Sequence, residues 1–432
     1  MRVHKQIQLL EKHDIKDKLL KWSQQFREVV WLDSNNYQQI YSSYDAVLAV
    51  DAFTVLQTDS EDAFDKLKEY QSHSKDWLFG YLTYDLKFDT ENLKSNNFDG
   101  LEFPELFFFQ PKKIFLLKGN VLEVQYLHFV DDEIDSDYVE ILNTNLFNSV
   151  SIENKDSMEI KLRITKDGYF NKFQKIHQHI SQGDIYEMNF CQEFYAENIN
   201  IDPLHVYQNL NQISQPPFAT FLKLEDKYLL SASPERYIRK ENTTIISQPI
   251  KGTSKRAIDI IEDEKLKSDL AVNEKERSEN IMIVDLVRND LSKTAVKGSV
   301  KVNELCKVYS FDQVHQMIST VTSEVLHTKN PVEVLRTTFP MGSMTGAPKV
   351  SAMKLIEDLE ETKRGLYSGS VGYFTPDNDF DFNVIIRSIL YNRSNKYVSY
   401  SVGGAITAKS TADAEYQECL VKANAMQDAL LS

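Results

Sequence analysis

The alternation of hydrophobic and polar residues predicts a chain that is rich in strands. Apolar runs on either side of a Lys-Gly-Asn turn predict a β-hairpin over residues 113–124, and a second hairpin is predicted over 219–232. Residues 79–85, 380–390 and 397–402 also have the pattern of strands. Many strands with few regular strand–helix–strand units favour an α+β class over a doubly wound sheet.

Helical spacing of apolar residues appears mainly in the second half of the chain. It predicts helices over residues 165–181, 264–291 and 412–431. The polar stretch 143–157 is the best candidate for a linker. We therefore expect an N-terminal scaffold region over residues 1–150 and a catalytic domain over residues 160–432.

Composition and charge exclude several classes of function. The 432 residues carry a formal charge of −15, which argues against nucleic acid or an anionic membrane as a partner. No apolar run approaches the roughly 18–20 residues that a membrane span needs, and no secretory signal is recognised. The three cysteines lie far apart, which is typical of a reducing cytoplasm, and we expect a cytoplasmic protein.

The sequence Pro-Ile-Lys-Gly-Thr predicts a lysine in a tight turn after a strand. Held against a ligand, Lys251 would be partly desolvated, which would lower its pKa and free its lone pair as a nucleophile. The alternative is a lysine in water, because most lysines are exposed.

Glutamates at helical spacing suggest a cation site. Glu276 and Glu279 share a face of one predicted helix, and Glu415, Glu418 and Lys422 share a face of the last. Two such helices with inward carboxylates could hold Mg²⁺, which takes one or two protein carboxylates and keeps water or substrate oxygens elsewhere. The alternative is two acidic faces in water.

Other candidates lie at strand ends and in glycine-containing loops. Glu235 follows a strand beside a proline turn, where an apolar pocket would raise its pKa and make it a general acid; a loop salt bridge is the alternative. Arg387 could bind a carboxylate or form an edge ion pair. Residues 339–349 form a Gly-rich loop that opens into a helix, which suits an anion. His315 by itself is better explained as structural.

Taken together, these segments resemble the chorismate-utilising enzyme family. The matching runs occur in the family's order over about residues 160–430, and they are SASPER, PIKGT, EKERSENIMIVDLVRNDL, FPMGSMTGAPK, RGLYSGSVGY, DFNVIIRS and EYQECLVKA. The N-terminal part contributes FGYLTYD and the weaker VVWLDS. The resemblance implies two orthogonally packed, antiparallel-rich sheets with flanking helices, in which the two halves of the chain interleave.

The resemblance also implies roles for individual residues. Glu279 and Glu418 would bind Mg²⁺, with Glu276 and Glu415 beside them. The carboxylates of chorismate would be held by a set of residues that comprises Gly252, Thr253, Tyr367, Arg387, Gly403, Gly404, Ala405 and Lys422, and we add Gln192 and His315 as substrate-binding candidates. Ala405 replaces a glycine that is usual in the family, which would narrow the pocket.

Two positions are expected to distinguish among the reactions of the family. Members that aminate chorismate at C4 typically carry lysine at the position of Lys251, and anthranilate- and isochorismate-forming members carry alanine. Members that add water at C2 usually have a lysine base where we align Gln192, and glutamine cannot deprotonate water. The implied reaction is attack of Lys251 on C2 while Glu235 protonates the departing C4 hydroxyl, followed by ammonia at C4. The product would be 4-amino-4-deoxychorismate, a precursor of p-aminobenzoate and folate.

Two rival functions remain open at this stage. The first is an anthranilate-forming enzyme of tryptophan biosynthesis, which the identity of the amino product would reveal. The second is a non-catalytic subunit that binds an amidotransferase, against which the complete set of candidate residues argues. No glutaminase pattern of Cys, His and Glu is recognised, so ammonia is expected from a separate glutamine amidotransferase subunit or from solution.

Overall fold

The strands of the protein form two connected series that share one long strand. The computed structural model describes residues 1–9, 14–37, 41–91, 93–146, 158–311 and 314–432, so most of the predicted linker lies outside the described residues. Every pairing between named strands is antiparallel. The predicted α+β class with antiparallel-rich sheets is therefore confirmed.

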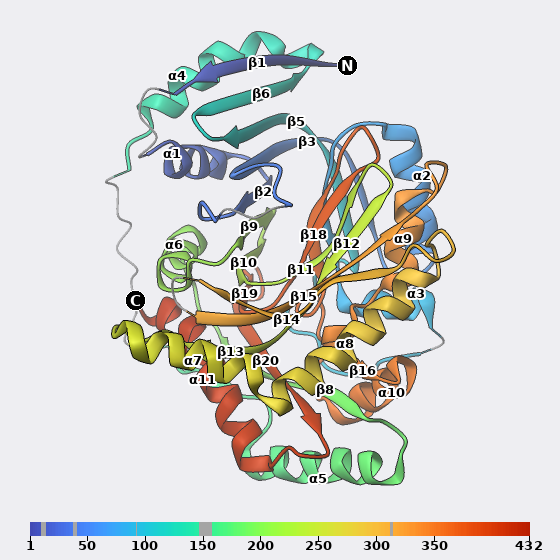
Figure 1. Ribbon diagram of the computed structural model, residues 1–432. Helices are drawn as coiled ribbons and strands as arrows, with labels where there is room; N and C mark the ends of the chain where they lie inside the picture. The colour runs from blue at the N-terminus through green and yellow to red at the C-terminus, as the bar shows by residue number, and fades with distance from the viewer. Residues whose placement is uncertain (10–13, 38–40, 92, 147–157, 312–313) are drawn as a thin grey trace.

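The first series contains the N-terminal strands and ends at the bottom of Figure 1. In order of pairing its members are β1 (Arg2–Gln8), β6 (Val121–Leu127), β5 (Leu106–Lys118), β3 (Ala46–Thr58), β2 (Glu28–Asp33), β9 (Phe218–Leu224), β10 (Lys227–Ser233), β19 (Ser388–Asn392), β20 (Tyr397–Thr407) and β8 (Glu187–Glu197), and β8 also pairs with the short β7 (Lys161–Leu162) and β16 (Gly346–Ala347). Strands from the N-terminal region thus pair with strands from the later part.

The second series begins at the first part of β5, where Leu106–Phe109 pair with β4 (Leu78–Leu82) on the edge opposite β3. Its members in order of pairing are β4, β17 (Ser370–Phe374), β18 (Phe380–Val384), β11 (Arg236–Glu241), β12 (Thr244–Gln248) and β15 (Val314–Glu324), and β15 also pairs with β13 (Ile250–Lys255) and β14 (Lys301–Ser310). The pairing of β4 with β17 joins the FGYLTYD segment to the RGLYSGSVGY segment.

Alternation of side chains along β5 explains how the core is divided. Phe107 and Phe109 enter a cluster between the two series, while Phe108, on the opposite face, enters the outer core of the second series. Further along, Phe115 enters the outer core of the first series. One strand therefore contributes to all three clusters, which holds the two series together.

Helices cover the outer faces of both series. They are α1 (Ile15–Trp22), α2 (Ala63–Ser74), α3 (Lys87–Thr90), α4 (Ile134–Asn143), α5 (Lys166–Gln182), α6 (Pro203–Ser214), α7 (Ile260–Val272), α8 (Glu274–Ser292), α9 (Pro331–Thr338), α10 (Lys349–Leu359) and α11 (Ala412–Leu431). Helices α1, α4, α5, α6, α10 and α11 pack on the first series, and α2, α8 and α9 on the second. No helix in the described part of the chain is long and apolar enough to span a membrane.

Two predicted elements are broken in the structure. The helix predicted over residues 264–291 is two helices, because Asn273 is extended and its side chain caps α8 by accepting a hydrogen bond from the backbone N–H of Glu276. The strand predicted over residues 380–390 is divided into β18 and β19, because Arg387 has a φ of 50°. Both breaks lie next to candidate site residues.

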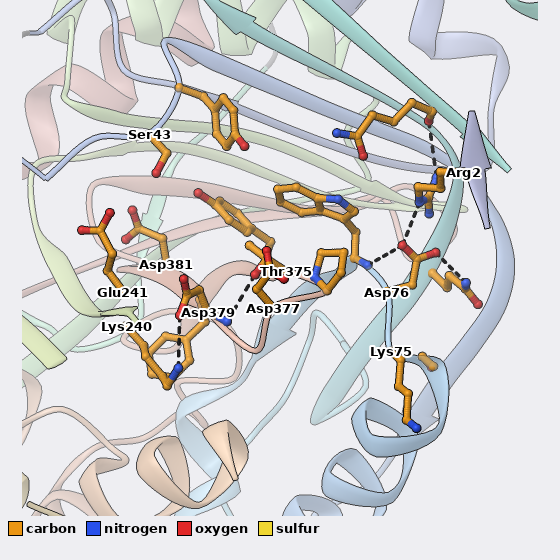
Figure 2. Close-up of a pocket in the computed structure, with 18 of the residues that line it drawn as sticks. Arg2, Ser43, Lys75, Asp76, Lys240, Glu241, Thr375, Asp377, Asp379 and Asp381 are labelled. Carbon is orange, nitrogen blue, oxygen red and sulfur yellow. Dashed lines mark hydrogen bonds and ion pairs between the residues drawn. The ribbon is translucent and has the colours of Figure 1, made fainter. Parts of the chain in front are cut away.

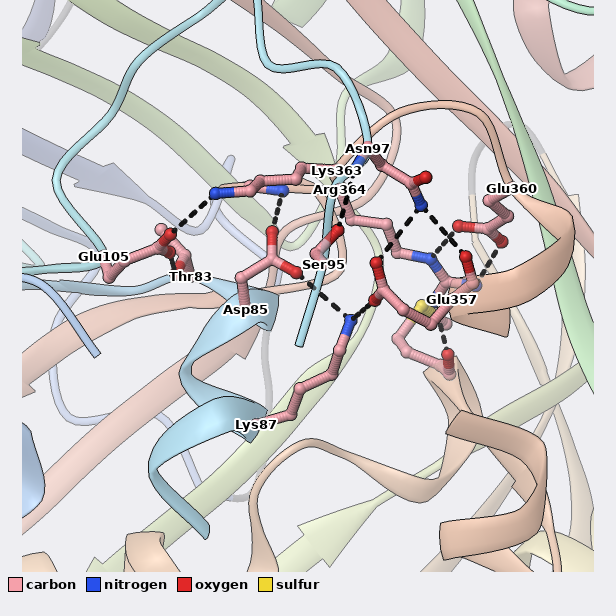
Figure 3. Close-up of polar contacts among 12 residues, drawn as sticks. Thr83, Asp85, Lys87, Ser95, Asn97, Glu105, Glu357, Glu360, Lys363 and Arg364 are labelled. Atoms are coloured by element: carbon pink, nitrogen blue, oxygen red, sulfur yellow. Dashed lines mark hydrogen bonds and ion pairs between the residues drawn. The ribbon is translucent and has the colours of Figure 1, made fainter. Parts of the chain in front are cut away.

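A buried ion-pair network fastens the N-terminal region to the later part of the chain. Lys87 is 1% exposed, and its Nζ lies 3.1 Å from Asp85 Oδ1 and 2.9 Å from Glu357 Oε2 (Figure 3). The second oxygen of Asp85 accepts a hydrogen bond of 2.8 Å from the backbone N–H of Gly365. The network therefore links residues about 280 positions apart in sequence.

Replacing Lys87 is expected to destabilise the fold strongly. Lys87→Met leaves Asp85 and Glu357 as buried carboxylates without their cation, and we expect a loss of about 3–5 kcal/mol in the free energy of unfolding. The control is Lys68→Met, because Lys68 is 44% exposed in its pair with Glu333 and should change stability by less than about 1 kcal/mol. Urea unfolding measures both variants, and similar losses would contradict a structural role for the buried pair.

Candidate active site

Lys251 lies in an irregular strand and not in the predicted turn. It belongs to β13, whose pairing with β15 shifts register between Ile250 and Thr253. Gly252 has a φ of +90°, and a Cβ atom there would lie 3.1 Å from Glu276 Oε2. The irregularity therefore needs glycine and turns Lys251 out of the regular ladder.

The expected lowering of the pKa of Lys251 is wrong. Burial does act in that direction, but the nearby carboxylates of Glu187 and Glu279 outweigh it and raise the pKa of the amine. The Nζ atom lies 3.3 Å from Glu187 Oε1, and the side chains are 13% and 1% exposed. The lysine is thus a buried ammonium ion in an acidic pocket.

Glu235 is a buried carboxyl group close to Lys251. It follows β10 and is 4% exposed. Burial raises its pKa to about 7, against the effects of the Ser343 hydroxyl, the charge of Lys251 and the backbone N–H of Ile250. A carboxyl group with this pKa is partly protonated at neutral pH and can donate a proton.

Carboxylates from α8 and α11 face one another around Lys275. The Nζ of Lys275 lies 3.9 Å from Glu279 Oε1 and 3.6 Å from Glu415 Oε1. Burial raises the pKa of Glu279 to about 7 and also raises that of Glu276. Glu418 pairs with Lys422 at 2.7 Å, and although burial opposes this, the lysine holds the pKa of Glu418 below its ordinary value.

The donor set of this cluster fits a hard divalent cation. Oε1 of Glu279 is buried and has no hydrogen-bond partner among the described residues, which leaves an acceptor available to a cation. Carboxylate oxygens are the ligands that Mg²⁺ prefers. Across the described ranges, however, no three His, Cys, Asp or Glu side chains are grouped closely enough to hold a metal ion by themselves. Water or substrate oxygens would have to complete the coordination.

Neighbouring elements carry groups that could bind an anion. These groups are cationic side chains and the backbone of two glycines. Lys422 Nζ donates a hydrogen bond of 2.9 Å to the carbonyl of Gly403 on β20. A Cβ atom at Gly403 would lie 2.4 Å from Cys191 Sγ, and one at Gly404 would lie 3.1 Å from Glu415 Oε2. Within the described chain, the guanidinium of Arg387 has no carboxylate within 4.0 Å, and the charge of Glu235 acts on it.

Three more of the predicted substrate-binding residues lie on or next to β20, β8 and β13. Ala405 pairs with Asn189 in the β8–β20 ladder, and the hydroxyl of Tyr367 lies 3.7 Å from Cys191 Sγ. Thr253 pairs with Gln316 in the irregular part of β13 and is exposed.

Two predicted residues have other surroundings. The ring nitrogens of His315 lie 2.9 Å from Ser310 Oγ and 3.0 Å from Asp263 Oδ1. Gln192 shares a face of β8 with Phe190 and Phe194, which belong to the apolar core, whereas Glu187 lies on the opposite face. The residue of β8 that faces Lys251 is therefore Glu187 and not Gln192.

Sequence reasoning missed Glu187, Lys275, Ser343 and a buried arginine. Glu187 left no distinctive signal, because β8 also contains the acidic residues Glu193 and Glu197. Arg364 is 5% exposed and donates hydrogen bonds to the carbonyls of Met344 at 2.6 Å and Asn189 at 2.8 Å, and to both oxygens of Glu360 (Figure 3). It thus ties β8 to the loop that carries Ser343.

A cavity of considerable size lies at a different place. It has a volume of about 550 Å³ and is lined by residues such as Arg2, Asp76, Trp77, Arg239 and Asp381 (Figure 2). None of the predicted site residues lines it. Its charges are largely paired already, since Arg2 contacts Asp76 at 2.8 Å and Arg239 contacts Asp381 at 3.2 Å. Chemistry, not size, therefore favours the site around Lys251.

Comparison with known proteins finds similar relatives that share one name. Aminodeoxychorismate synthase component 1 of Escherichia coli (strain K12) is 42% identical over 261 residues, which are 60% of this chain and 57% of that protein. The protein of the same name from Bacillus subtilis (strain 168) is 32% identical over 387 residues, covering 88% and 80%. The chain thus spans little more than half the length of the Escherichia coli relative.

Solved structures show the same fold. Anthranilate synthase component I from Streptococcus pneumoniae TIGR4 matches with a TM-score of 0.78 and 25% identity, covering 90% of this chain and 93% of that one. MenF, the menaquinone-specific isochorismate synthase from Escherichia coli, matches with a TM-score of 0.79 and 15% identity, covering 100% and 94%. The family described as chorismate binding enzyme matches residues 27–428, which is nearly the whole chain. The chain therefore belongs to the chorismate binding enzyme family.

Proposed function

We propose that the protein converts chorismate and ammonia to 4-amino-4-deoxychorismate, for p-aminobenzoate and folate synthesis. The observation that carries the proposal is the buried Lys251 beside the buried Glu235, a nucleophile next to an acid. Relatives named aminodeoxychorismate synthase component 1, at 42% and 32% identity, support the same reaction.

In this proposal Lys251 acts at C2 of the ring, and Glu235 acts at the oxygen on C4. The Nζ of Lys251 attacks C2 while Glu235 gives its proton to the departing C4 oxygen. Ammonia then bonds to C4 and expels the lysine from C2. A covalent route of this kind divides one difficult substitution into two easier ones. The pKa of about 7 supports Glu235 as the acid, because a useful fraction is protonated near neutral pH.

The carboxylates of chorismate require cationic partners in an acidic protein. Arg387 is the strongest candidate, because its guanidinium lacks a carboxylate within 4.0 Å among the described residues and can bind an anion through two parallel hydrogen bonds. Lys422 and the backbone of Gly403 and Gly404 would hold the second carboxylate, with Tyr367 at the side. Gly252 and Thr253 would line the pocket beside Lys251, at the bulge of β13.

We assign the cation site to Glu279 and Glu418, with Glu276 and Glu415 beside them. Bound Mg²⁺ would neutralise the ring carboxylate and orient the substrate. The buried Oε1 of Glu279, which has no hydrogen-bond partner among the described residues, supports this assignment. We also propose that ammonia is supplied by a separate glutamine amidotransferase subunit, which the words "component 1" in the names of the relatives support.

The proposal is tested by the identity of the product. Chorismate, Mg²⁺ and ammonium are incubated with the protein, with and without an added aminodeoxychorismate lyase, and the products are separated by chromatography. We expect p-aminobenzoate only when the lyase is present. Anthranilate formed without the lyase would instead identify an anthranilate synthase and overturn the proposal.

Lys251→Ala is expected to abolish formation of the 4-amino product, because the nucleophile is lost. The matched control is Lys255→Ala, which changes an exposed lysine on the same strand and should leave turnover unchanged within about 2-fold. Turnover of chorismate measures both variants. Activity of Lys251→Ala equal to that of the wild type would remove Lys251 from the mechanism.

Glu235→Gln is expected to stabilise the protein at high pH while it removes activity. The folded-state pKa of about 7 lies above the ordinary value of 4.5, so ionisation destabilises the folded wild type as the pH rises. The variant should gain about 3 kcal/mol at pH 8 and less than about 1 kcal/mol at pH 5. Urea unfolding at both pH values measures the difference, with the exposed Glu241→Gln as control. A gain that does not depend on pH would contradict the assignment.

Removal of metal is expected to stop turnover. A chelator should abolish product formation, and added Mg²⁺ should restore it. Glu279→Gln should raise the Mg²⁺ concentration for half-maximal activity by about 10-fold or more, because a charged ligand is lost. Glu274→Gln, at an exposed position in the first turn of the same helix, is the control. Full activity in the chelated protein would exclude the metal from the reaction.

A further inference from the structure

A second carboxylate is held against the amine of Lys251. Glu187 is the first residue of β8, where its backbone pairs with Ala347 of β16 and Thr407 of β20. Its side chain is 1% exposed, and Oε1 lies 3.3 Å from Lys251 Nζ. The other oxygen, Oε2, is also buried and has no hydrogen-bond partner among the described residues. Strand pairing on both sides therefore fixes an incompletely bonded carboxylate beside the amine.

The surroundings of Lys251 create a chemical requirement. Nearby carboxylates favour its ammonium form, which has no lone pair and cannot attack carbon. The amine must therefore lose a proton before or during the attack. Because Nζ lies 3.3 Å from a carboxylate that is only 1% exposed, the nearest acceptor is a group in contact with Nζ.

The other carboxylates have roles that compete with this one. Glu235 must be protonated when the C4 oxygen leaves, so it cannot also accept the proton from Lys251 at the same step. Glu279 and Glu276 belong to the group of carboxylates around Lys275, and we assign the cation to that group of carboxylates. Glu187 is the carboxylate whose contact with Nζ lies within ion-pair distance.

We propose that Glu187 is a catalytic residue, the general base that takes the proton from Lys251 Nζ. The inference rests on the proposed function. The proton passes to Glu187, the Nζ–C2 bond forms, both ring double bonds shift by one position, and the C4–O bond breaks. The oxygen leaves as water with the proton of Glu235.

The second half of the reaction restores every group. The nitrogen of ammonia bonds to C4, the electron pair shifts back, and the C2–Nζ bond breaks to release the neutral amine. Glu187 returns its proton to Lys251, and the new C4 ammonium gives a proton to Glu235. The sum is chorismate and ammonia to 4-amino-4-deoxychorismate and water, so no other reactant is needed.

The experiment is single-turnover formation of the Lys251 adduct in the absence of ammonia. Intact-protein mass spectrometry follows the addition of chorismate less water in the presence of Mg²⁺. Glu187→Gln keeps the size and an oxygen that can accept a hydrogen bond, but it cannot take a proton. We expect adduct formation to be about 100-fold slower or more, with KM for chorismate changed by less than about 3-fold. Glu187→Asp keeps a base and should react at an intermediate rate.

The opposite result has a physical meaning as well. If Glu187 only holds Lys251 as a cation, loss of its charge frees the amine, and Glu187→Gln reacts as fast as the wild type or faster. That result would overturn the inference, as would equal rates for the Gln and Asp variants.

A control and a comparison separate the remaining explanations. Glu193→Gln changes another buried glutamate of β8, which pairs with Arg163 at 3.1 Å, and it should keep the rate within about 3-fold. An unchanged KM shows that Glu187→Gln is folded. If the wild type gives neither adduct nor 4-amino product, the proposed function itself fails; an active wild type with an undiminished Glu187→Gln contradicts only the role of Glu187.

Discussion

The burial of several carboxylates around one amine is the constraint on which this structure depends. Glu187, Glu235 and Glu279 all act on Lys251, and each is more than nine-tenths buried. Such charges are unfavourable away from water unless a cation, a proton or hydrogen bonds offset them. The three carboxylates differ in what offsets their charge. Glu187 pairs with the amine, whereas burial raises the pKa of Glu235 and Glu279 to about 7, so that protons offset part of the charge.

Backbone geometry brings these groups together from distant parts of the chain. The ladder between β8 and β20 places Glu187 at one end and the glycines of β20 in its middle, where a Cβ at Gly403 would clash with Cys191. The guanidinium of Arg364 holds β8 and the Ser343 loop through backbone carbonyls. Because these contacts restrain the main chain, they orient side chains that they do not touch. The N-terminal region contributes through the network of Lys87, which fastens the loop that follows Arg364.

The sequence was sufficient for the fold class, but not for the facing of side chains. Lys251, Glu235 and Glu279 were selected because they lie in motifs that resemble a known family, and their roles stay predictions. The raised pKa of Glu235 was predicted correctly, but the direction for Lys251 could not be, since its pKa depends on Glu187, which is remote in sequence. Gln192 was selected by its alignment with a family position, and the sequence does not reveal that Glu187 is the residue of β8 that faces Lys251. The break of the long helix at Asn273 depends on a capping hydrogen bond that helical periodicity does not report.

The distribution of charge also explains how an acidic protein can accept a dianion. In the proposed function, chorismate would bring two carboxylates to a site that already holds those of Glu187 and Glu279, in a chain of net charge −15. Lys251 is engaged by Glu187, and Lys422 by Glu418, so neither cation is fully available. The guanidinium of Arg387, which has no paired carboxylate among the described residues, could offset only one of the incoming charges. The second charge would have to be met by a proton on a glutamate or by a divalent cation at Glu279, and this requirement is a physical argument for the proposed metal.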